Sequence, residues 1–372
     1  MSKKAEMPFA ARLSKLQELV KEQGVDSLLV EDLVNIRYLT GLKVSAGALV
    51  VGKDTQIFLD GRYFDMAIKS SPVPVSLLTQ TTLSDGFKKG IFGQVIGFDK
   101  ESTLYARFEK LSQMAEGAKK KRQLVPLENL VLRRLRSIKS KEEAKALAKA
   151  AEMAVSGFRY GMGLLKKGIS ELEVARGIKT FWLREGADKE SFEPIIAFGE
   201  NSACPHHKPS GRKLKQGDIV LFDLGVTLQG YASDLTRTFF FGNANPQLKH
   251  IYQVVLEAQE ETLKLCKPGT PLHLLDQKAR SLITEAGFGP QFSHSLGHGI
   301  GLEVHELPSL PRVALTNSPE EVLAPGMAIT IEPGIYLPKL GGVRIEDTVI
   351  ISERGHKNLT KLPKEMIALD IP

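Results

Sequence analysis

The spacing of apolar residues predicts that short strands and helices alternate through the first third of the chain. Leu13, Leu16 and Val20 recur at helical spacing within residues 9–22 and predict an opening helix. Short apolar runs bounded by turn residues predict strands. The expected strands are at 27–30, 46–51, 56–59, 73–78 and 95–98. One further helix is expected to begin after residue 63, and another to cover residues 103–116. This order is typical of an α/β domain.

A charge-rich, strongly helical segment follows and marks a domain boundary. Ser140 is a suitable N-cap there, and Glu142 and Glu143 lie in the first turn, where carboxylates are favourable. A chain of 372 residues also exceeds what one hydrophobic core usually organises. The expected domains are 1–136 and 137–372. Further helices are expected at 141–165, 170–185, 247–266 and 272–286, with strands and glycine-rich turns between them, so the fold class is α/β (α+β).

The amino-acid composition indicates the cellular compartment of the protein and whether it associates with a membrane. Hydrophobic residues make up 42% of the chain and charged residues 25%, as in ordinary globular proteins. Cys204 and Cys266, the only cysteines, supply no disulfide framework, which favours a reducing setting. No apolar signal core follows the basic N-terminus, and no apolar run approaches the roughly 18 residues of a membrane span. We therefore expect a cytoplasmic protein without a membrane partner.

The net charge of +7 and the pI near 9.1 raise the question of nucleic-acid binding. Basic residues cluster in KKKR at 119–122 and in LRRLR at 132–136. Neither run is interleaved with the aromatic residues on which bases stack. We interpret both as solvated surface and expect no nucleic-acid partner.

Histidines gather at two places in the second domain. HSLGHGIGLEVHE, residues 294–306, contains His294, His298 and His305, although the whole chain has only eight histidines. GENSACPHHKP, residues 199–209, contains His206 beside His207 in an expected loop. The glycines and apolar residues between the histidines of the first stretch indicate a close-packed site. Cys204 has no evident base nearby, so a cysteine nucleophile is not expected.

Carboxylates interrupt apolar strands twice, each time with a partner beyond a glycine turn. Asp223 lies within VLFDLG and Asp234 follows the GYAS turn; Glu332 lies within ITIEPG and Glu346 follows a GG turn. Two antiparallel strands can bring the members of each pair together. Each acid alone is explained by an ion pair or a helix cap. Four converging carboxylates, however, repel one another and resist ionisation unless cations balance them.

Two divalent metal ions would supply that balance. Carboxylates with one imidazole suit Mn²⁺, Co²⁺ or Zn²⁺ and differ from the cysteine-rich sites of structural zinc. Paired ions can activate a water molecule and polarise a carbonyl group. The composition of the site therefore indicates hydrolysis of an amide bond.

These motifs resemble the pita-bread metallopeptidases and, within them, the Xaa-Pro peptidases. NIRYLTG (35–41) and DGRY (60–63) are similar to a creatinase-like N-terminal domain. FDLGV, YASDLTRT, GHGIGLEVHE, IEPGIY and GGVRIEDT are similar to the pita-bread catalytic domain. The resemblance covers nearly the whole chain and implies a homodimer acting on proline-containing peptides.

The resemblance also implies a role for each site residue. The implied metal ligands are Asp223 on one ion, His298 and Glu332 on the other, and Asp234 and Glu346 bridging both. The implied catalytic residues are His206, His305, which would stabilise the tetrahedral intermediate, and Glu332, which would carry a proton. The implied substrate-side residues are His294, Tyr336 and Arg344, of which Arg344 would also orient Glu346. His207 matches no such role.

One departure bears on the substrate. Prolidases of this family commonly carry an arginine just after HExP to hold the carboxylate of a dipeptide, whereas this chain has Ser309 there and Arg312 three residues later. The sequence thus favours an Xaa-Pro aminopeptidase that accepts longer peptides, with an Xaa-Pro dipeptidase (prolidase) as the alternative. Three other members of the wider family fit less well. The resemblance of the N-terminal domain argues against a methionyl aminopeptidase. Creatinase chemistry does not need the metal ligands, and a catalytically silent binding homologue would be expected to lose them, whereas this chain has all five.

Overall fold

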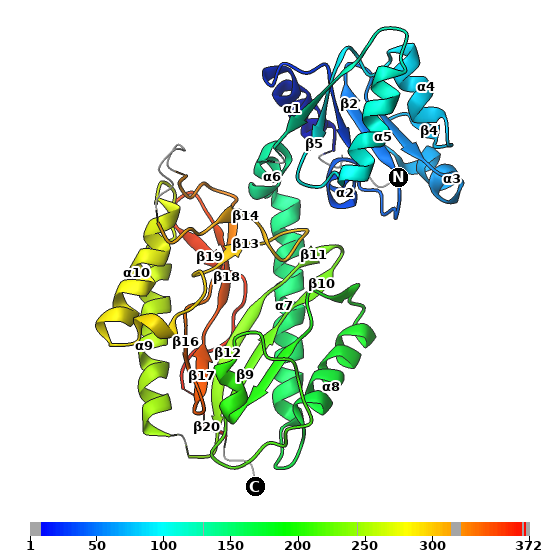
Figure 1. The fold of residues 1–372 in the computed structure, drawn as a ribbon. Coiled ribbons are helices and arrows are strands. Elements are labelled where there is room, and N and C mark those ends of the chain that lie inside the picture. Colours follow the sequence, from blue (N-terminus) through cyan, green and yellow to red (C-terminus); the bar gives the residue numbers. More distant parts are fainter. Residues whose placement is uncertain (1–8, 129, 244, 314–320, 367, 370–372) are drawn as a thin grey trace, which may run out of the picture. The chain divides into compact units, whose positions relative to one another are not determined.

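The structure, a computed structural model, describes residues 9–128, 130–243, 245–313, 321–366 and 368–369 (Figure 1). By its internal contacts the chain divides into two compact units, Met1–Arg136 and Ser137–Pro372. Each unit has its own sheets and its own hydrophobic core.

A six-stranded mixed sheet organises the N-terminal unit. From one edge to the other its strands are β4 (Val75–Leu77), β3 (Gln56–Leu59), β2 (Ala48–Gly52), β1 (Ser27–Val30), β5 (Val95–Asp99) and β6 (Gln123–Leu127). β2 is antiparallel to both of its neighbours, β1 and β3, whereas the other neighbouring strands of this sheet are parallel. Phe58, Phe87 and Phe92 pack edge to face in its core. The helices are α1 (Phe9–Glu22), α2 (Leu33–Thr40), α3 (Gly61–Ser70), α4 (Thr82–Lys89), α5 (Tyr105–Glu116) and α6 (Leu130–Ser137).

The C-terminal unit contains two larger sheets, each flanked by a pair of helices. The first consists of β20 (Ala368–Leu369), β12 (Leu235–Phe241), β9 (Ile219–Leu224) and β8 (Ile195–Phe198), near α7 (Lys141–Leu164) and α8 (Glu171–Arg184). The second consists of β14 (Glu306–Ser309), β13 (His298–Gly299), β15 (Ala328–Ile331), β18 (Asp347–Ile351) and β19 (His356–Asn358), near α9 (Pro246–Leu263) and α10 (Leu272–Glu285). Smaller elements are β7 (Lys189–Glu190), β10 (Val226–Leu228), β11 (Tyr231–Ala232), β16 (Gly334–Leu337), β17 (Gly341–Arg344), η1 (Gly199–Ala203) and η2 (Gly289–Gln291).

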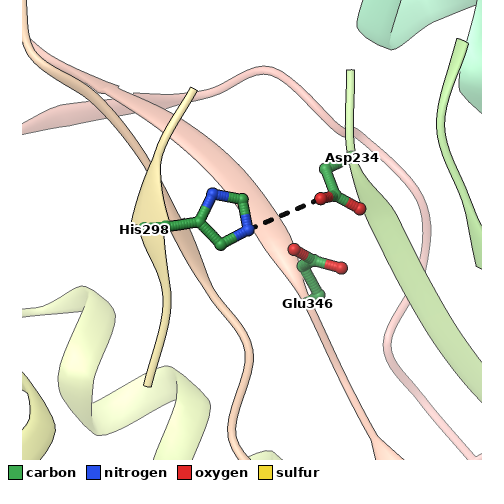
Figure 2. A group of neighbouring side chains, drawn as sticks. All are labelled: Asp234, His298 and Glu346. Atoms are coloured by element: carbon green, nitrogen blue, oxygen red, sulfur yellow. Dashed lines mark ion pairs between the residues drawn. The ribbon is translucent and has the colours of Figure 1, made fainter. Parts of the chain in front are cut away.

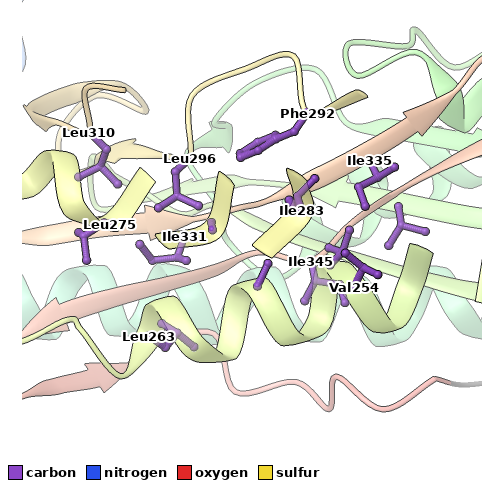
Figure 3. Close-up of a cluster of buried hydrophobic side chains, with 14 of the residues drawn as sticks. Val254, Leu263, Leu275, Ile283, Phe292, Leu296, Leu310, Ile331, Ile335 and Ile345 are labelled. Carbon is purple, nitrogen blue, oxygen red and sulfur yellow. The ribbon is translucent and has the colours of Figure 1, made fainter. Parts of the chain in front are cut away.

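Separate apolar clusters join each pair of helices to its strands. In one, Phe158 of α7 packs edge to face against Phe222 of β9 and Phe239 of β12. In the other, α9 and α10 pack on strands β15 to β18 through aliphatic side chains (Figure 3). The strand ends between these two cores are therefore held from both sides, and the candidate site residues lie at those ends.

Strand register brings the predicted acids close together, in a way that differs in detail from the expectation. β9 and β12 are antiparallel as predicted, but Asp223 pairs with Thr236, and Asp234 lies just before β12. A small hairpin, β10–β11, forms the turn between them. Glu332 likewise follows the end of β15 and Glu346 precedes β18, because Ile331 pairs with Asp347. The acids thus lie at strand ends, where the ladders stop and side chains can converge.

The helices predicted in the C-terminal unit are confirmed to within a few residues, including the Ser140 cap, which forms a capping box with Glu143. In the N-terminal unit, α2, α4 and β6 were not predicted from the sequence. NIRYLTG lies in α2: Asp32 caps the amide of Asn35, and Gly41 ends the helix in the left-handed region. That cap pair was a usable signal. Within the described residues, none of the helices combines the length and apolar composition of a membrane span.

Candidate metal centre and active site

Three of the predicted ligands point toward one another at the strand ends. One ligand atom each of Asp234, His298 and Glu346 lies within 4.8 Å of the others (Figure 2). His298 Nε2 is 3.6 Å from Asp234 Oδ2 and 3.4 Å from Glu332 Oε1. The centre therefore draws residues from both sheets of the C-terminal unit.

The His298 ring is oriented so that one nitrogen faces the acids. Its Nδ1 lies 3.0 Å from the carbonyl oxygen of Gly299 and, as N–H, donates to it. That hydrogen bond leaves the Nε2 lone pair directed toward Asp234 and Glu332. Burial, together with nearby His305, lowers the pKa of His298 to about 4, so the imidazole is neutral near pH 7. A neutral imidazole is the form that binds a metal ion.

The carboxylates lack the counter-charge that their burial demands. Asp223 Oδ1 and Glu346 Oε1 are buried and accept no hydrogen bond from the described residues. Burial and mutual repulsion raise the pKa of Asp234 and Glu346 well above their usual range. Burial raises the pKa of Glu332 to about 8. Unpaired buried oxygens and repelling acids are the features that bound divalent cations would relieve, so these residues fit a metal site.

Arg344 bonds one site acid directly and a second one through a threonine hydroxyl. Its guanidinium is 3% exposed and donates to Asp223 Oδ2 at 2.6 Å and to the Tyr336 hydroxyl at 2.7 Å. From the sequence, Arg344 was expected to orient Glu346. It reaches Glu346 through Thr236: Arg344 Nε donates to the Thr236 hydroxyl at 3.2 Å, and that hydroxyl donates to Glu346 Oε2 at 2.7 Å. The direct bond to Asp223 was not expected, because Asp223 lies on a strand more than a hundred residues earlier in the chain.

Tyr336 lies behind the site, and His294 lies at its edge. The Tyr336 hydroxyl is 2.8 Å from His294 Nε2 and accepts from Arg344, and the residue is 6% exposed. Burial raises the pKa of Tyr336 to about 12 and lowers that of His294 to about 4. Both groups are therefore neutral near pH 7. His294 lines the cleft, whereas Tyr336 is not among its lining residues.

A cleft of about 780 Å³ opens above the acids. His206 and His305 both line it, and the His305 ring lies edge to face against His298 with centroids 4.2 Å apart. Apolar side chains, including Phe192, Ile195 and Leu310, form other parts of the lining. A volume of this size accommodates a small peptide, and charged groups at one side with an apolar wall are typical of ligand sites.

Comparison with known proteins identifies the family. A model described as the creatinase/prolidase N-terminal domain matches residues 12–138, and one described as metallopeptidase family M24 matches residues 145–353. The second match alone spans more than half of the chain. The chain belongs to metallopeptidase family M24.

Three relatives extend the M24 assignment over nearly the whole chain. The Xaa-Pro dipeptidase of Pyrococcus horikoshii is 39% identical over 361 residues, which are 96% of this chain and 98% of that protein. The structure of the Xaa-Pro dipeptidase from Bacillus anthracis matches with a TM-score of 0.90 at 35% identity, covering 97% of this chain and 100% of that one. The structure of the X-Pro aminopeptidase from Thermotoga maritima matches with a TM-score of 0.84 at 30% identity, covering 95% of this chain and 100% of that one.

These matches confirm the fold class, a creatinase-like N-terminal α/β domain with a pita-bread catalytic domain. They also confirm the predicted enzyme class. The M24 chain is a metal-dependent hydrolase, and its family implies divalent metal ions.

A buried carboxylate that the sequence analysis missed holds the loop carrying His206. Glu171 is 0% exposed and accepts from the amide of Phe198, from Asn201 Nδ2, and from the amide and hydroxyl of Ser210. His207 Nε2 lies 2.8 Å from the same carboxylate. His207 therefore anchors the loop from below, which explains why it matches no substrate-facing role.

Two further buried ion pairs in the C-terminal unit hold the segments that bear other site residues. Lys139 Nζ donates to Glu306 Oε1 at 2.8 Å, with side chains 1% and 2% exposed, directly after His305. Arg237 donates to Asp347 Oδ1 at 2.6 Å and to the backbone carbonyl of Glu346. Neither pair is suggested by local sequence, because the partners are separated by more than a hundred residues.

Proposed function

We propose that the chain is an Xaa-Pro peptidase that uses two metal ions to hydrolyse the bond between an N-terminal residue and the following proline, with dipeptides as substrates. The observation that carries this proposal is the group of acids beside His298 at the cleft, whose negative charges lack sufficient positive partners among the described residues. The substrate class is supported by two relatives named Xaa-Pro dipeptidases, both covered over nearly their full length.

In this proposal the metal ligands are Asp223, Asp234, His298, Glu332 and Glu346. Bound divalent ions would acidify a water molecule and polarise the scissile carbonyl. The carboxylate-rich donor set favours Mn²⁺, with Co²⁺ or Zn²⁺ as alternatives that reconstitution would distinguish. A cytoplasmic homodimer stays a prediction from the sequence.

The chain's own residues then act around the reacting bond. His305 and His206 line the cleft beside the acids and would donate hydrogen bonds to the oxygen that becomes negative. Glu332 would pass a proton to the leaving proline nitrogen, which must be protonated to depart. Arg344 and Tyr336 would keep Asp223 and His294 in place. The amide before proline has no N–H, so the apolar wall would select proline by shape.

A second candidate is an aminopeptidase that acts on longer peptides. Ser309 lines the cleft and is neutral where prolidases of the family commonly have arginine, and the solved relatives include an X-Pro aminopeptidase. The test is hydrolysis of Ala-Pro and Ala-Pro-Ala by the enzyme reconstituted with Mn²⁺. Our proposal predicts a higher kcat/KM for Ala-Pro. A higher kcat/KM for the tripeptide would favour the aminopeptidase, and cleavage of neither would exclude both.

A further inference from the structure

One ammonium group on the described lining of the cleft is accessible to a bound substrate. Among its described lining residues, lysine and arginine are represented by Lys208 and Arg344. Arg344 is 3% exposed, and its donors are already directed to Asp223, Tyr336 and Thr236. Lys208 is exposed, and no ion pair to its ammonium group is found among the described residues. Of these two cationic side chains, Lys208 is therefore the one whose charged group is accessible to a substrate.

The loop is built so that the Lys208 side chain is offered to the cleft. Its neighbour His207 reaches inward to Glu171, and Ser210 is bonded to the same carboxylate through its amide and hydroxyl. Lys208 therefore lies between two anchored residues. His206, His207 and Lys208 all line the cleft, but only His206 and Lys208 are exposed, because His207 is half-buried against Glu171. The fixed backbone lowers the entropy that the lysine must lose on binding.

Dipeptides and longer peptides differ in the charge next to the proline ring. An Xaa-Pro dipeptide carries its α-carboxylate directly on the proline ring, whereas a longer peptide has a neutral amide at that point. A carboxylate that leaves water for the cleft needs a charged donor, and a lysine ammonium supplies one. Ser309, on another part of the lining, has a hydroxyl group but no charge.

We propose that Lys208 binds the α-carboxylate of the proline residue and thereby selects dipeptides. This inference rests on the proposed function and deepens it, because it gives a structural reason for preferring dipeptides in a chain with serine at position 309. Lys208 would act as a specificity-determining residue: it touches the substrate at the end remote from the N-terminal amine.

The test compares two substrates that differ only in this charge, Ala-Pro and Ala-prolinamide, with the Mn²⁺-loaded full chain at pH 8. For the wild type we expect a higher kcat/KM for the acid. Lys208→Gln should lower the ratio of kcat/KM for the acid to that for the amide by about tenfold or more, the scale of one charge-assisted hydrogen bond. Lys208→Arg should keep most of the ratio. Arg312→Gln is the matched control, because Arg312 is an exposed cation that donates to the Ser293 carbonyl and is not among the lining residues.

Two results would overturn the inference while leaving the proposed function intact. One is an unchanged ratio in active Lys208→Gln, including the case in which both substrates slow equally. The other is a selective loss of acid hydrolysis in Arg312→Gln, which would make Arg312 the carboxylate receptor. If the wild type hydrolyses neither Ala-Pro nor Ala-prolinamide, the proposed function itself fails, and the inference fails with it.

Discussion

Replacement of Glu171 by glutamine tests how the loop with His206 is held. A glutamine oxygen at the Oε1 position still accepts from Phe198 and Asn201, but these bonds lose their charge assistance. The glutamine amide then faces the Ser210 amide, which loses its acceptor. A buried donor without a partner costs about 1–3 kcal/mol, and charged hydrogen bonds exceed neutral ones by about 1 kcal/mol each. We therefore expect Glu171→Gln to lower the free energy of unfolding by about 3 kcal/mol.

For a unit of this size that loss corresponds to a fall in Tm of about 6–12 °C. Loosening the loop should also lower kcat/KM for Ala-Pro by about tenfold or more at 25 °C, because small displacements of a positioned group are costly. Glu173→Gln is the matched control. Glu173 lies in the same helical turn but is 57% exposed and bonded to Lys213, and glutamine can still complete its capping box with Ser170.

The pH dependence gives a second, independent check on Glu171. Burial raises the pKa of Glu171, but hydrogen bonds from Ser210 and His207 outweigh it, so the pKa lies below its usual 4.5. A folded-state pKa below the unfolded-state value stabilises the protein above about pH 4.5, and that stability is lost as the pH falls through the lowered value. The stability difference between wild type and Glu171→Gln should thus be complete at pH 7 and shrink below pH 4.5. Equal urea midpoints for Glu171→Gln and Glu173→Gln at pH 7 would refute the reasoning.

Two other substitutions test the packing around the site. Asp347→Asn should lower the free energy of unfolding by about 3–5 kcal/mol, because it leaves buried Arg237 without its charge partner. Urea denaturation measures this loss. Recovery of stability in the double variant with Arg237→Met would show that the unpaired charge is the cause. Gly157→Ala should lower Tm although alanine favours helix by about 1 kcal/mol, because the added methyl would lie 2.1 Å from Trp182 Nε1. A higher Tm would show that Trp182 moves freely.

The acids and histidines of the site were predictable because each breaks a local pattern. Asp223 and Glu332 interrupt apolar runs, and a histidine cluster in a glycine-rich segment is conspicuous in a chain with eight histidines. The structure brings three of these residues together, Asp234, His298 and Glu346. The assignment of individual metal ligands stays a prediction.

The supporting charges were not predictable, because their local patterns are ordinary. Glu171 and Glu173 both look like first-turn acids of a helix, yet Glu171 is 0% exposed and Glu173 faces solvent. What separates them is the loop at 198–210, which packs over Glu171 only in three dimensions. The direct bond between Arg344 and Asp223 was missed for the same reason. Periodicity indicates which face of an element is buried, but not which distant segment covers it.

The most direct test of the central claim is a metal titration of Ala-Pro hydrolysis. The full chain is stripped with a chelator and then given Mn²⁺ in steps, in parallel with Asp234→Asn. A paired-ion mechanism predicts no hydrolysis without metal and a rate that rises with added Mn²⁺ until about two equivalents per chain are bound. The rate of the Asp234→Asn variant should not respond to Mn²⁺. Hydrolysis that survives chelation, or a variant as active as the wild type, would contradict this mechanism.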